Sequence, residues 1–134
     1  MDKKIALVFP GQGAQAVGMG KELAAAYPVA ADLFRQADEI LGWPLSKICR
    51  EGPEEELTKT SVCQPALYVH GLAALAVARE KLGDFPVSGA AGLSLGEFTA
   101  HAAAGTFDFA TGPRFRRRRS WPPCRRAWPR RLPA

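Results

Sequence analysis

The apolar positions of this chain change their period along its length, and each period predicts a different kind of element. Residues 5–9 form a continuous apolar run that ends at a Pro-Gly pair, which is typical of a strand buried on both faces of a parallel sheet. Apolar residues recur at helical spacing over 19–27 and again over 29–41, and Pro28 between them suits the first turn of the second helix. We therefore expect one strand followed by two helices.

The middle of the chain predicts two more helices. Three glutamates that follow Pro53 mark the start of a short helix, because the helix dipole favours acids at that end. Ser61 with Gln64 three residues later fits a capping box, and the stretch from there to Leu82 is apolar nearly all round. That second helix is expected to be long and buried.

Small residues at 87–91 predict a second strand, which leads through a glycine-rich turn into an alanine-rich helix ending near residue 105. Two short apolar strands separated by helices are the pattern of α/β proteins with a parallel sheet. The fold class expected from the pattern is therefore α/β.

Charge divides the chain at about residue 112. Residues 1–112 hold all 13 acids and nine of the 18 lysines and arginines, while residues 113–134 hold nine arginines and no acid. The last segment has neither helical nor strand period and cannot bury a core. We therefore predict a partial domain at 1–112 and an aberrant arginine-, proline- and tryptophan-rich tail at 113–134.

Composition excludes several other classes of protein. The longest apolar run, 66–78, is shorter than the roughly 20 residues that cross a bilayer, so we expect no membrane span. The N-terminus lacks the cleavage site of a signal peptide. Cys49, Cys63 and Cys124 do not have CxxC spacing, which argues against a metal site or a disulfide framework. These features favour a cytoplasmic protein without metal.

The strongest chemical signal is the sequence Gly92-Leu93-Ser94-Leu95-Gly96. This G-x-S-x-G pattern between a predicted strand and a predicted helix is typical of a nucleophile elbow, where glycines allow a sharp turn that exposes the serine. We interpret Ser94 as a nucleophile. The amide of Leu95 at the helix N-terminus would then face an oxyanion on the attacked carbonyl.

A second glycine-rich loop, 11–16, formally matches a dinucleotide-binding fingerprint, with Asp32 about 20 residues further on. That fingerprint needs the acid at the end of a second strand, whereas Asp32 lies in a helical pattern. We therefore interpret the loop as part of a site at the carboxyl end of the first strand.

Together these motifs resemble the malonyl-CoA:acyl carrier protein transacylase family. The resemblance rests on three motifs that occur in the same order and at similar spacing. The first is the strand and glycine-rich loop at 5–15 with Gly-Met-Gly at 18–20. The other two are Gln-Pro-Ala-Leu at 64–67 and Gly-Leu-Ser-Leu-Gly-Glu-Phe-Thr-Ala at 92–100. It covers residues 3 to about 112. Because the strand begins so soon after the initial methionine, the free-standing enzyme is favoured over a synthase domain.

The resemblance implies a function and a set of site residues. It implies transfer of a malonyl group from malonyl-CoA to acyl carrier protein in fatty acid biosynthesis, through an acyl-serine at Ser94, with a coenzyme A thioester as substrate and no cofactor. It further implies that the amides of Gln12 and Leu95 form the oxyanion hole and that Gln64 binds substrate. Arg119, 25 residues after the serine, is at the position of the arginine that pairs with the malonyl carboxylate, although prolines soon after it would break the expected helix.

The resemblance also indicates what the chain lacks. Members carry a catalytic histidine far downstream and a ferredoxin-like subdomain, and neither is expected here. His101 is seven residues beyond Ser94, roughly 10 Å along a helix, and His70 falls mid-helix. We therefore expect only the N-terminal part of a hydrolase-like subdomain, interrupted by a frameshift between Gly112 and Ser120. Such a chain is expected to be inactive and poorly stable, with open sheet edges.

Two other functions are compatible with parts of the sequence. The arginine-rich tail with interleaved aromatic residues could bind nucleic acid or an anionic surface, although we expect no nucleic-acid partner. The elbow could instead belong to a small serine esterase, which would need a base such as His101.

Overall fold

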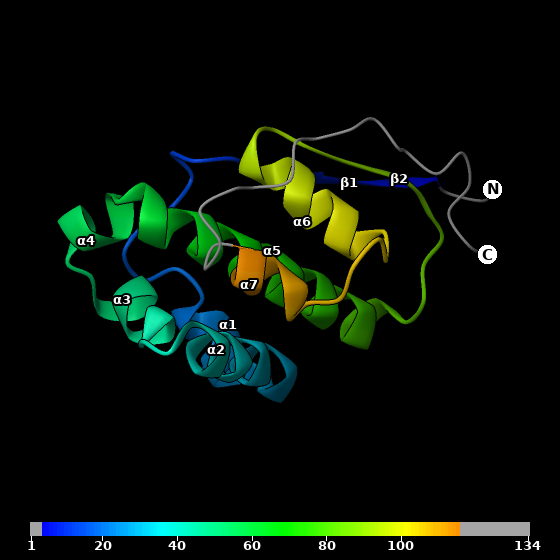
Figure 1. Cartoon of the computed structure of the whole chain (residues 1–134). Coiled ribbons are helices and arrows are strands. Elements are labelled where there is room, and N and C mark those ends of the chain that lie inside the picture. The colour runs from blue at the N-terminus through cyan, green and yellow to red at the C-terminus, as the bar shows by residue number, and fades with distance from the viewer. Residues whose placement is uncertain (1–3, 116–134) are drawn as a thin grey trace.

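The computed structural model describes residues 4–115, and their elements form a small α/β structure (Figure 1). The α/β class predicted from the apolar pattern is confirmed. The elements, in chain order, are β1 (Ile5–Phe9), α1 (Lys21–Ala26), α2 (Pro28–Leu41), α3 (Leu45–Glu51), α4 (Glu54–Thr58), α5 (Thr60–Leu82), β2 (Val87–Gly92), α6 (Leu95–Ala103) and α7 (Thr111–Phe115).

The two strands pair in parallel, with Leu7 opposite Ala90 and Phe9 opposite Gly92. Parallel neighbours need a long crossover connection, and here α1 to α5 supply it. Both carboxyl ends consequently lie at the same edge of the sheet, where the loop after β1 meets the turn after β2. The predicted strands and their parallel arrangement are thus confirmed.

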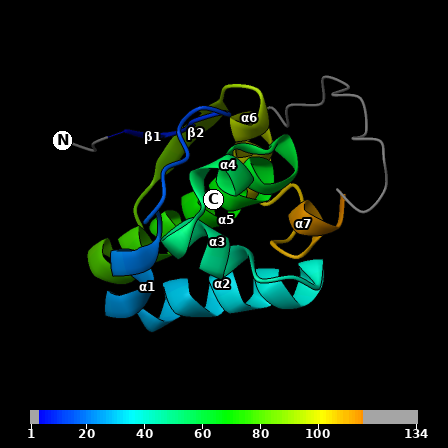
Figure 2. The same cartoon turned by 90° about the vertical axis from the view of Figure 1, so that its left-hand side faces the viewer.

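Helix α5 runs through the middle of the molecule. In both views the strands and α6 lie on one side of it, and α1 and α2 lie on the other (Figures 1 and 2). Among the described residues, α5 is long and apolar enough to cross a membrane, a property that the shorter run 66–78 did not predict. More than half of its apolar stretch is buried by neighbouring elements, as in the core helix of a folded domain.

Most buried side chains form one cluster around α5, which we call the helical core. Its members come from α2, α3, α4 and α5, and they pack against half-buried residues of α1 and of the segment that leads to α7. The buried members are Ala30, Phe34, Ala37, Leu45, Cys49, Leu57, Val62, Ala66, Tyr68, Val69, Ala73 and Val77.

A second, smaller cluster, which we call the sheet core, consists of Phe9, Leu75, Ala90 and Ala100. It packs one face of the sheet against α5 and α6. On the opposite face Val8 is 77% exposed. The prediction that the first strand is buried on both faces is therefore wrong for the described part of the chain, because helices cover only one face.

The long helix begins differently from its prediction. It starts at Thr60 after Lys59, and no side chain caps it, so Ser61 lies inside the helix and the predicted capping box is wrong. The backbone carbonyl of Lys59 accepts hydrogen bonds from the amides of Val62 and Cys63 at 2.7 and 2.8 Å. Only Lys59 separates α4 from α5, and its backbone carbonyl, rather than the Ser61 hydroxyl, accepts hydrogen bonds from the first turn of α5.

Two short helices were absent from the sequence prediction. The first residues of α3 are fixed by Asp38 of α2, which accepts from the Ser46 amide at 2.8 Å and from its hydroxyl at 2.5 Å. Asp108 likewise accepts from the Thr111 amide at 2.8 Å where α7 begins. Helix α7 crosses residue 112, the predicted domain boundary, and Gly112 itself is buried.

Candidate active site

Ser94 occupies the turn between β2 and α6 and has an unusual backbone conformation. Its φ is 53° and its ψ is −113°, and it is the non-glycine residue with positive φ in the described part of the chain. Such a conformation costs about 1–3 kcal/mol and persists only where the surrounding structure enforces it. The side chain is exposed at the N-terminus of α6. The strand, sharp turn and helix predicted around Ser94 are therefore present.

The two glycines of the motif allow this turn because backbone approaches them closely. A Cβ atom added to Gly92 would lie 1.9 Å from the carbonyl carbon of Gly96. One added to Gly96 would lie 2.1 Å from the carbonyl oxygen of Phe9, at the end of β1. The first turn of α6 thus rests directly on both strand ends, and the Leu95 amide, in the first turn of the helix, has no partner within the helix.

The loop after β1 lies against the same turn. The Leu93 amide donates to the Phe9 carbonyl at 3.3 Å, and a Cβ added to Gly11 would lie 2.5 Å from the Leu93 carbonyl oxygen. Gln12 follows directly, so the structure brings the segments of both predicted oxyanion donors, Gln12 and Leu95, together beside Ser94. The parallel topology produces this meeting, because it puts both strand ends at one edge.

The side chain of Gln12 reaches the start of α5. Its Nε2 donates to Thr60 Oγ1 at 3.2 Å, a contact between residues 48 positions apart. Gln64, the predicted substrate-binding residue, is half-buried one helical turn after Thr60 and lies on the same side of α5. Sequence reasoning missed Thr60, because no local pattern links the beginning of a helix to a loop so distant in the chain.

Neither histidine is placed to act as a base for Ser94. The His101 Nδ1 atom lies 3.5 Å from Thr106 Oγ1, beyond the C-terminal end of α6, whereas Ser94 precedes its N-terminus. His70 lies on α5 beside a pocket lined by α1, and burial lowers its pKa. The geometry therefore gives no support to an esterase that uses His101 as its base.

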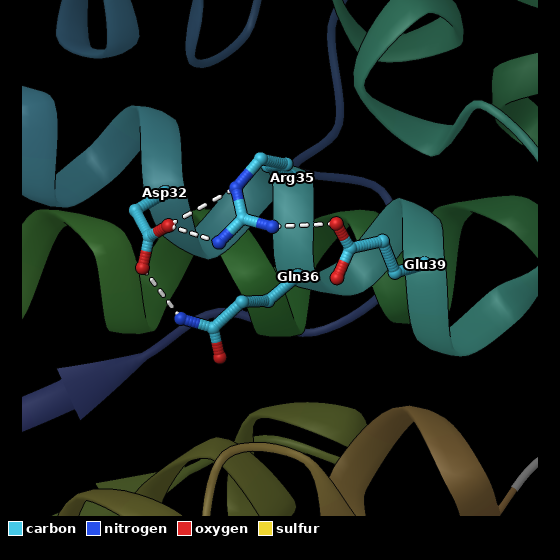
Figure 3. A network of polar contacts seen from close by, with 4 residues as sticks. All are labelled: Asp32, Arg35, Gln36 and Glu39. Atoms are coloured by element: carbon cyan, nitrogen blue, oxygen red, sulfur yellow. Dashed lines mark hydrogen bonds and ion pairs between the residues drawn. The ribbon is translucent and has the colours of Figure 1, made fainter.

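Asp32, which a dinucleotide site would need at the end of a strand, lies in α2 (Figure 3). Its carboxylate accepts from Arg35 at 2.5 Å and from Gln36 at 2.6 Å, and these hydrogen bonds lower its pKa. Arg35 also pairs with Glu39 at 2.5 Å. The exposed network satisfies the carboxylate within one helix, so the rejection of a dinucleotide fingerprint is confirmed by the position of Asp32.

The remaining candidates concern metal binding, thiols and Arg119. Residues 4–115 contain no group of three or more histidine, cysteine or acidic side chains that could hold a metal ion. Cys49 and Cys63 are buried, and burial raises the pKa of the Cys49 thiol to about 12. Arg119 and Cys124 lie outside the described residues.

The sequence matches the acyl transferase domain family over residues 6–119. The malonyl CoA-acyl carrier protein transacylase of Haemophilus influenzae is 46% identical over 107 residues, which are 80% of this chain and 34% of that protein. The Escherichia coli K12 protein of the same name is 43% identical over 111 residues, 83% of this chain and 36% of its own length.

Solved structures agree with these sequence matches. An acyl-carrier-protein-S-malonyltransferase from Bartonella henselae superposes with a TM-score of 0.81 at 42% identity, covering 86% of this chain and 37% of its own. A malonyl-transacylase in complex with a type II PKS acyl-carrier protein gives 0.79 at 45% identity, covering 85% and 37%.

The match includes the strand before the first glycine loop, the Gln-Pro-Ala-Leu segment and the serine elbow, and it extends through Arg119. The chain spans about a third of the length of the curated relatives it matches. By sequence and by fold, this chain belongs to the acyl transferase domain family.

Proposed function

We propose that this chain carries the nucleophile and the oxyanion hole for transfer of a malonyl group from malonyl-CoA to acyl carrier protein, in cytoplasmic fatty acid biosynthesis. The observation that carries the proposal is the exposed Ser94 at φ 53°, between two strand ends and the N-terminus of α6. The relatives that match are named for this reaction. The described elements would then belong to the hydrolase-like subdomain of such an enzyme, without its ferredoxin-like subdomain.

The reaction would proceed in two balanced steps. The Ser94 hydroxyl oxygen attacks the thioester carbonyl of malonyl-CoA, the carbon–sulfur bond breaks, and the serine proton leaves with the coenzyme A thiol. The phosphopantetheine thiol of acyl carrier protein then attacks the carbonyl carbon of the serine ester. A carbon–sulfur bond forms, the carbon–oxygen bond to Ser94 breaks, and the thiol proton passes to the serine oxygen, which leaves malonyl-acyl carrier protein and free Ser94. The amides of Gln12 and Leu95 would stabilise the negative oxygen formed in each step, since both belong to segments that meet beside the elbow.

Substrate binding would use residues on two sides of the elbow. Gln64 would contact the acyl group from α5, on the side where Gln12 and Thr60 are joined. Arg119 would pair with the free malonyl carboxylate through its planar guanidinium, which suits bidentate recognition of a carboxylate. The protein partner would be acyl carrier protein, which one similar transacylase binds in its solved complex.

The missing base determines how this proposal is tested. A serine hydroxyl is a poor nucleophile without a general base within about 3 Å, and neither His70 nor His101 provides one. We expect the purified chain to show no measurable turnover to acyl carrier protein. Imidazole in solution is expected to replace the base and to acylate Ser94 with malonyl-CoA, at a rate that rises with imidazole concentration.

Peptide mapping by mass spectrometry checks this expectation. One malonyl group should appear on the peptide that contains Ser94, Ser94→Ala should abolish it, and Ser88→Ala, an exposed serine on the same strand, should leave it unchanged. Equal labelling of several serines, or no labelling of Ser94 at any imidazole concentration, would show that the elbow is not an acyl-transfer site.

A further inference from the structure

The hydroxyl of Thr60 joins the loop after β1 to the beginning of helix α5 (Figure 1). Gln12 Nε2 donates to Thr60 Oγ1 at 3.2 Å. Further along the loop, the amide of Gly18 donates to the carbonyl of Cys49 in α3 at 2.8 Å. The loop is thus attached to the helices near both of its ends, by a side chain on the side of Ser94 and by backbone where it approaches α1.

Thr60 is exposed, but the backbone that carries it is firmly held. Only Lys59 separates it from α4, whose Leu57 has no exposed surface. Val62 and Cys63, in the first turn of α5, are also buried. A β-branched side chain has few rotamers, so the position of the Thr60 hydroxyl is closely defined.

Gln12 needs such an anchor because it lies between two glycines. Gly11 is buried against the carbonyl of Leu93, and Gly13 has a φ of 111°. The Gly13 amide donates within the loop, to Gln15 Oε1 at 2.8 Å. Because glycine has the freest backbone, the loop alone fixes the direction of the Gln12 amide weakly. A hydrogen bond from the Gln12 side chain to a fixed hydroxyl removes much of that freedom.

We propose that Thr60 is a positioning residue, which directs the backbone amide of Gln12 toward the oxyanion that forms when Ser94 attacks a thioester. The proposal rests on the proposed function, since that function assigns the Gln12 amide to the oxyanion hole. In this role Thr60 acts through Gln12 and contacts no substrate itself. Loss of a preorganised donor lowers the rate of the chemical step rather than the binding of substrate.

Two substitutions of Thr60 and one control test this role. Thr60→Val keeps the shape of the side chain and removes its hydroxyl, Thr60→Ser keeps the hydroxyl, and Thr58→Val makes the first change at an exposed threonine in α4. The rate of imidazole-dependent acylation of Ser94 is measured by mass spectrometry over a range of malonyl-CoA concentrations. Thr60→Val should lower the maximal rate about tenfold and leave the half-saturating concentration unchanged. Thr60→Ser and Thr58→Val should stay close to the parent rate.

A double-mutant cycle shows whether Thr60 acts through Gln12. Gln12→Met removes the side-chain donor and keeps the backbone amide. In that background Thr60→Val should cause no further loss, because the hydrogen bond is already absent. Additive losses, equal losses in Thr60→Val and Thr58→Val, or a raised half-saturating concentration would overturn the proposal. A Thr60→Val rate equal to that of the parent chain would overturn it as well.

A measurement without substrate separates this proposal from the proposed function. The order of the Gln12 backbone amide, measured by NMR relaxation, should fall in Thr60→Val and be retained in Thr60→Ser. If the parent chain never acylates Ser94, the proposed function fails, and the relaxation data decide the role of Thr60. An equally ordered Gln12 amide in Thr60→Val would show that Thr60 does not position it.

Discussion

The helical core and the sheet core of this molecule differ in how completely the chain closes them. The helical core is formed by side chains of α2, α3, α4 and α5, and several of its members, including Leu45 and Leu57, have no exposed surface. The sheet core contains four buried residues, and the strand beside them exposes Val8. The helical core is therefore enclosed by helices on several sides, whereas the sheet is packed against helices on one face and exposed on the other.

The difference matters because the candidate active site lies beside the smaller sheet core. Ser94 and the Gln12 loop stand at the edge of the two-stranded sheet, and their positions depend on backbone contacts between Phe9 and Gly96. The start of α5 connects the helical core to this site, because Thr60 accepts a hydrogen bond from Gln12. The turn that exposes Ser94 is thus fully formed beside a sheet that has one exposed face.

Truncating one aromatic residue in each core should give the largest contrast. Phe34→Ala removes a 4% exposed ring that packs against Gly20, and should lower the free energy of unfolding by about 3–5 kcal/mol. Phe9→Ala should cost clearly less, because fewer buried groups surround the sheet core. Urea denaturation followed by circular dichroism compares them, and equal losses would mean that the two cores are not energetically distinct.

Adding a single methyl group should distinguish the inner contact of the sheet from its outer face. Gly96→Ala would force the new Cβ to 2.1 Å from the Phe9 carbonyl oxygen, so we expect a loss of about 1–3 kcal/mol and no imidazole-dependent acylation of Ser94. Gly89→Ala adds the same group in open space and should be neutral or slightly stabilising. Thermal unfolding measures both, and a destabilising Gly89→Ala would indicate that the outer face is already covered.

The smallest expected effect concerns acid. Hydrogen bonds from Thr111 lower the pKa of Asp108, so its stabilising effect is present above the pKa of the unfolded state and is lost as the pH falls through the lower, folded value. Asp108→Asn should therefore weaken folding slightly at pH 7 and have less effect near pH 3. Asp84→Asn, in the loop after α5, is the control. The urea midpoints of both variants at the two pH values test this, and an unchanged Asp108→Asn difference would contradict it.

The sequence predicted well those elements whose signals are local. The apolar run 5–9 and the small-residue run 87–91 both became strands, and α2 begins at Pro28 as its position between two helical patterns indicated. The turn at Ser94 was predictable because Gly92 is crowded by the backbone of Gly96, four residues further along the chain. Each of these features depends on interactions between close neighbours in the chain.

The failures have the opposite origin. The start of α3 depends on Asp38, eight residues away, and the start of α5 on the tight exit from α4, so neither follows from its own composition. The burial of β1 on one face only could not be predicted from its sequence, Ile-Ala-Leu-Val-Phe. An apolar run shows that both faces of a strand can be buried, but it does not show which elements pack against each face.

By itself, then, the sequence determined the α/β class and the strand, sharp turn and helix around Ser94, because each depends on residue type and spacing. The tertiary structure alone decided that Gln12 meets Thr60, that the Gln12 loop packs against the Ser94 turn, and that Val8 faces outward. The two contacts join segments that are far apart in the chain, and the exposure of Val8 depends on which face of the sheet the helices cover. Their geometry is set by the parallel crossover and by which faces the helices cover, and no local pattern of residues encodes that choice.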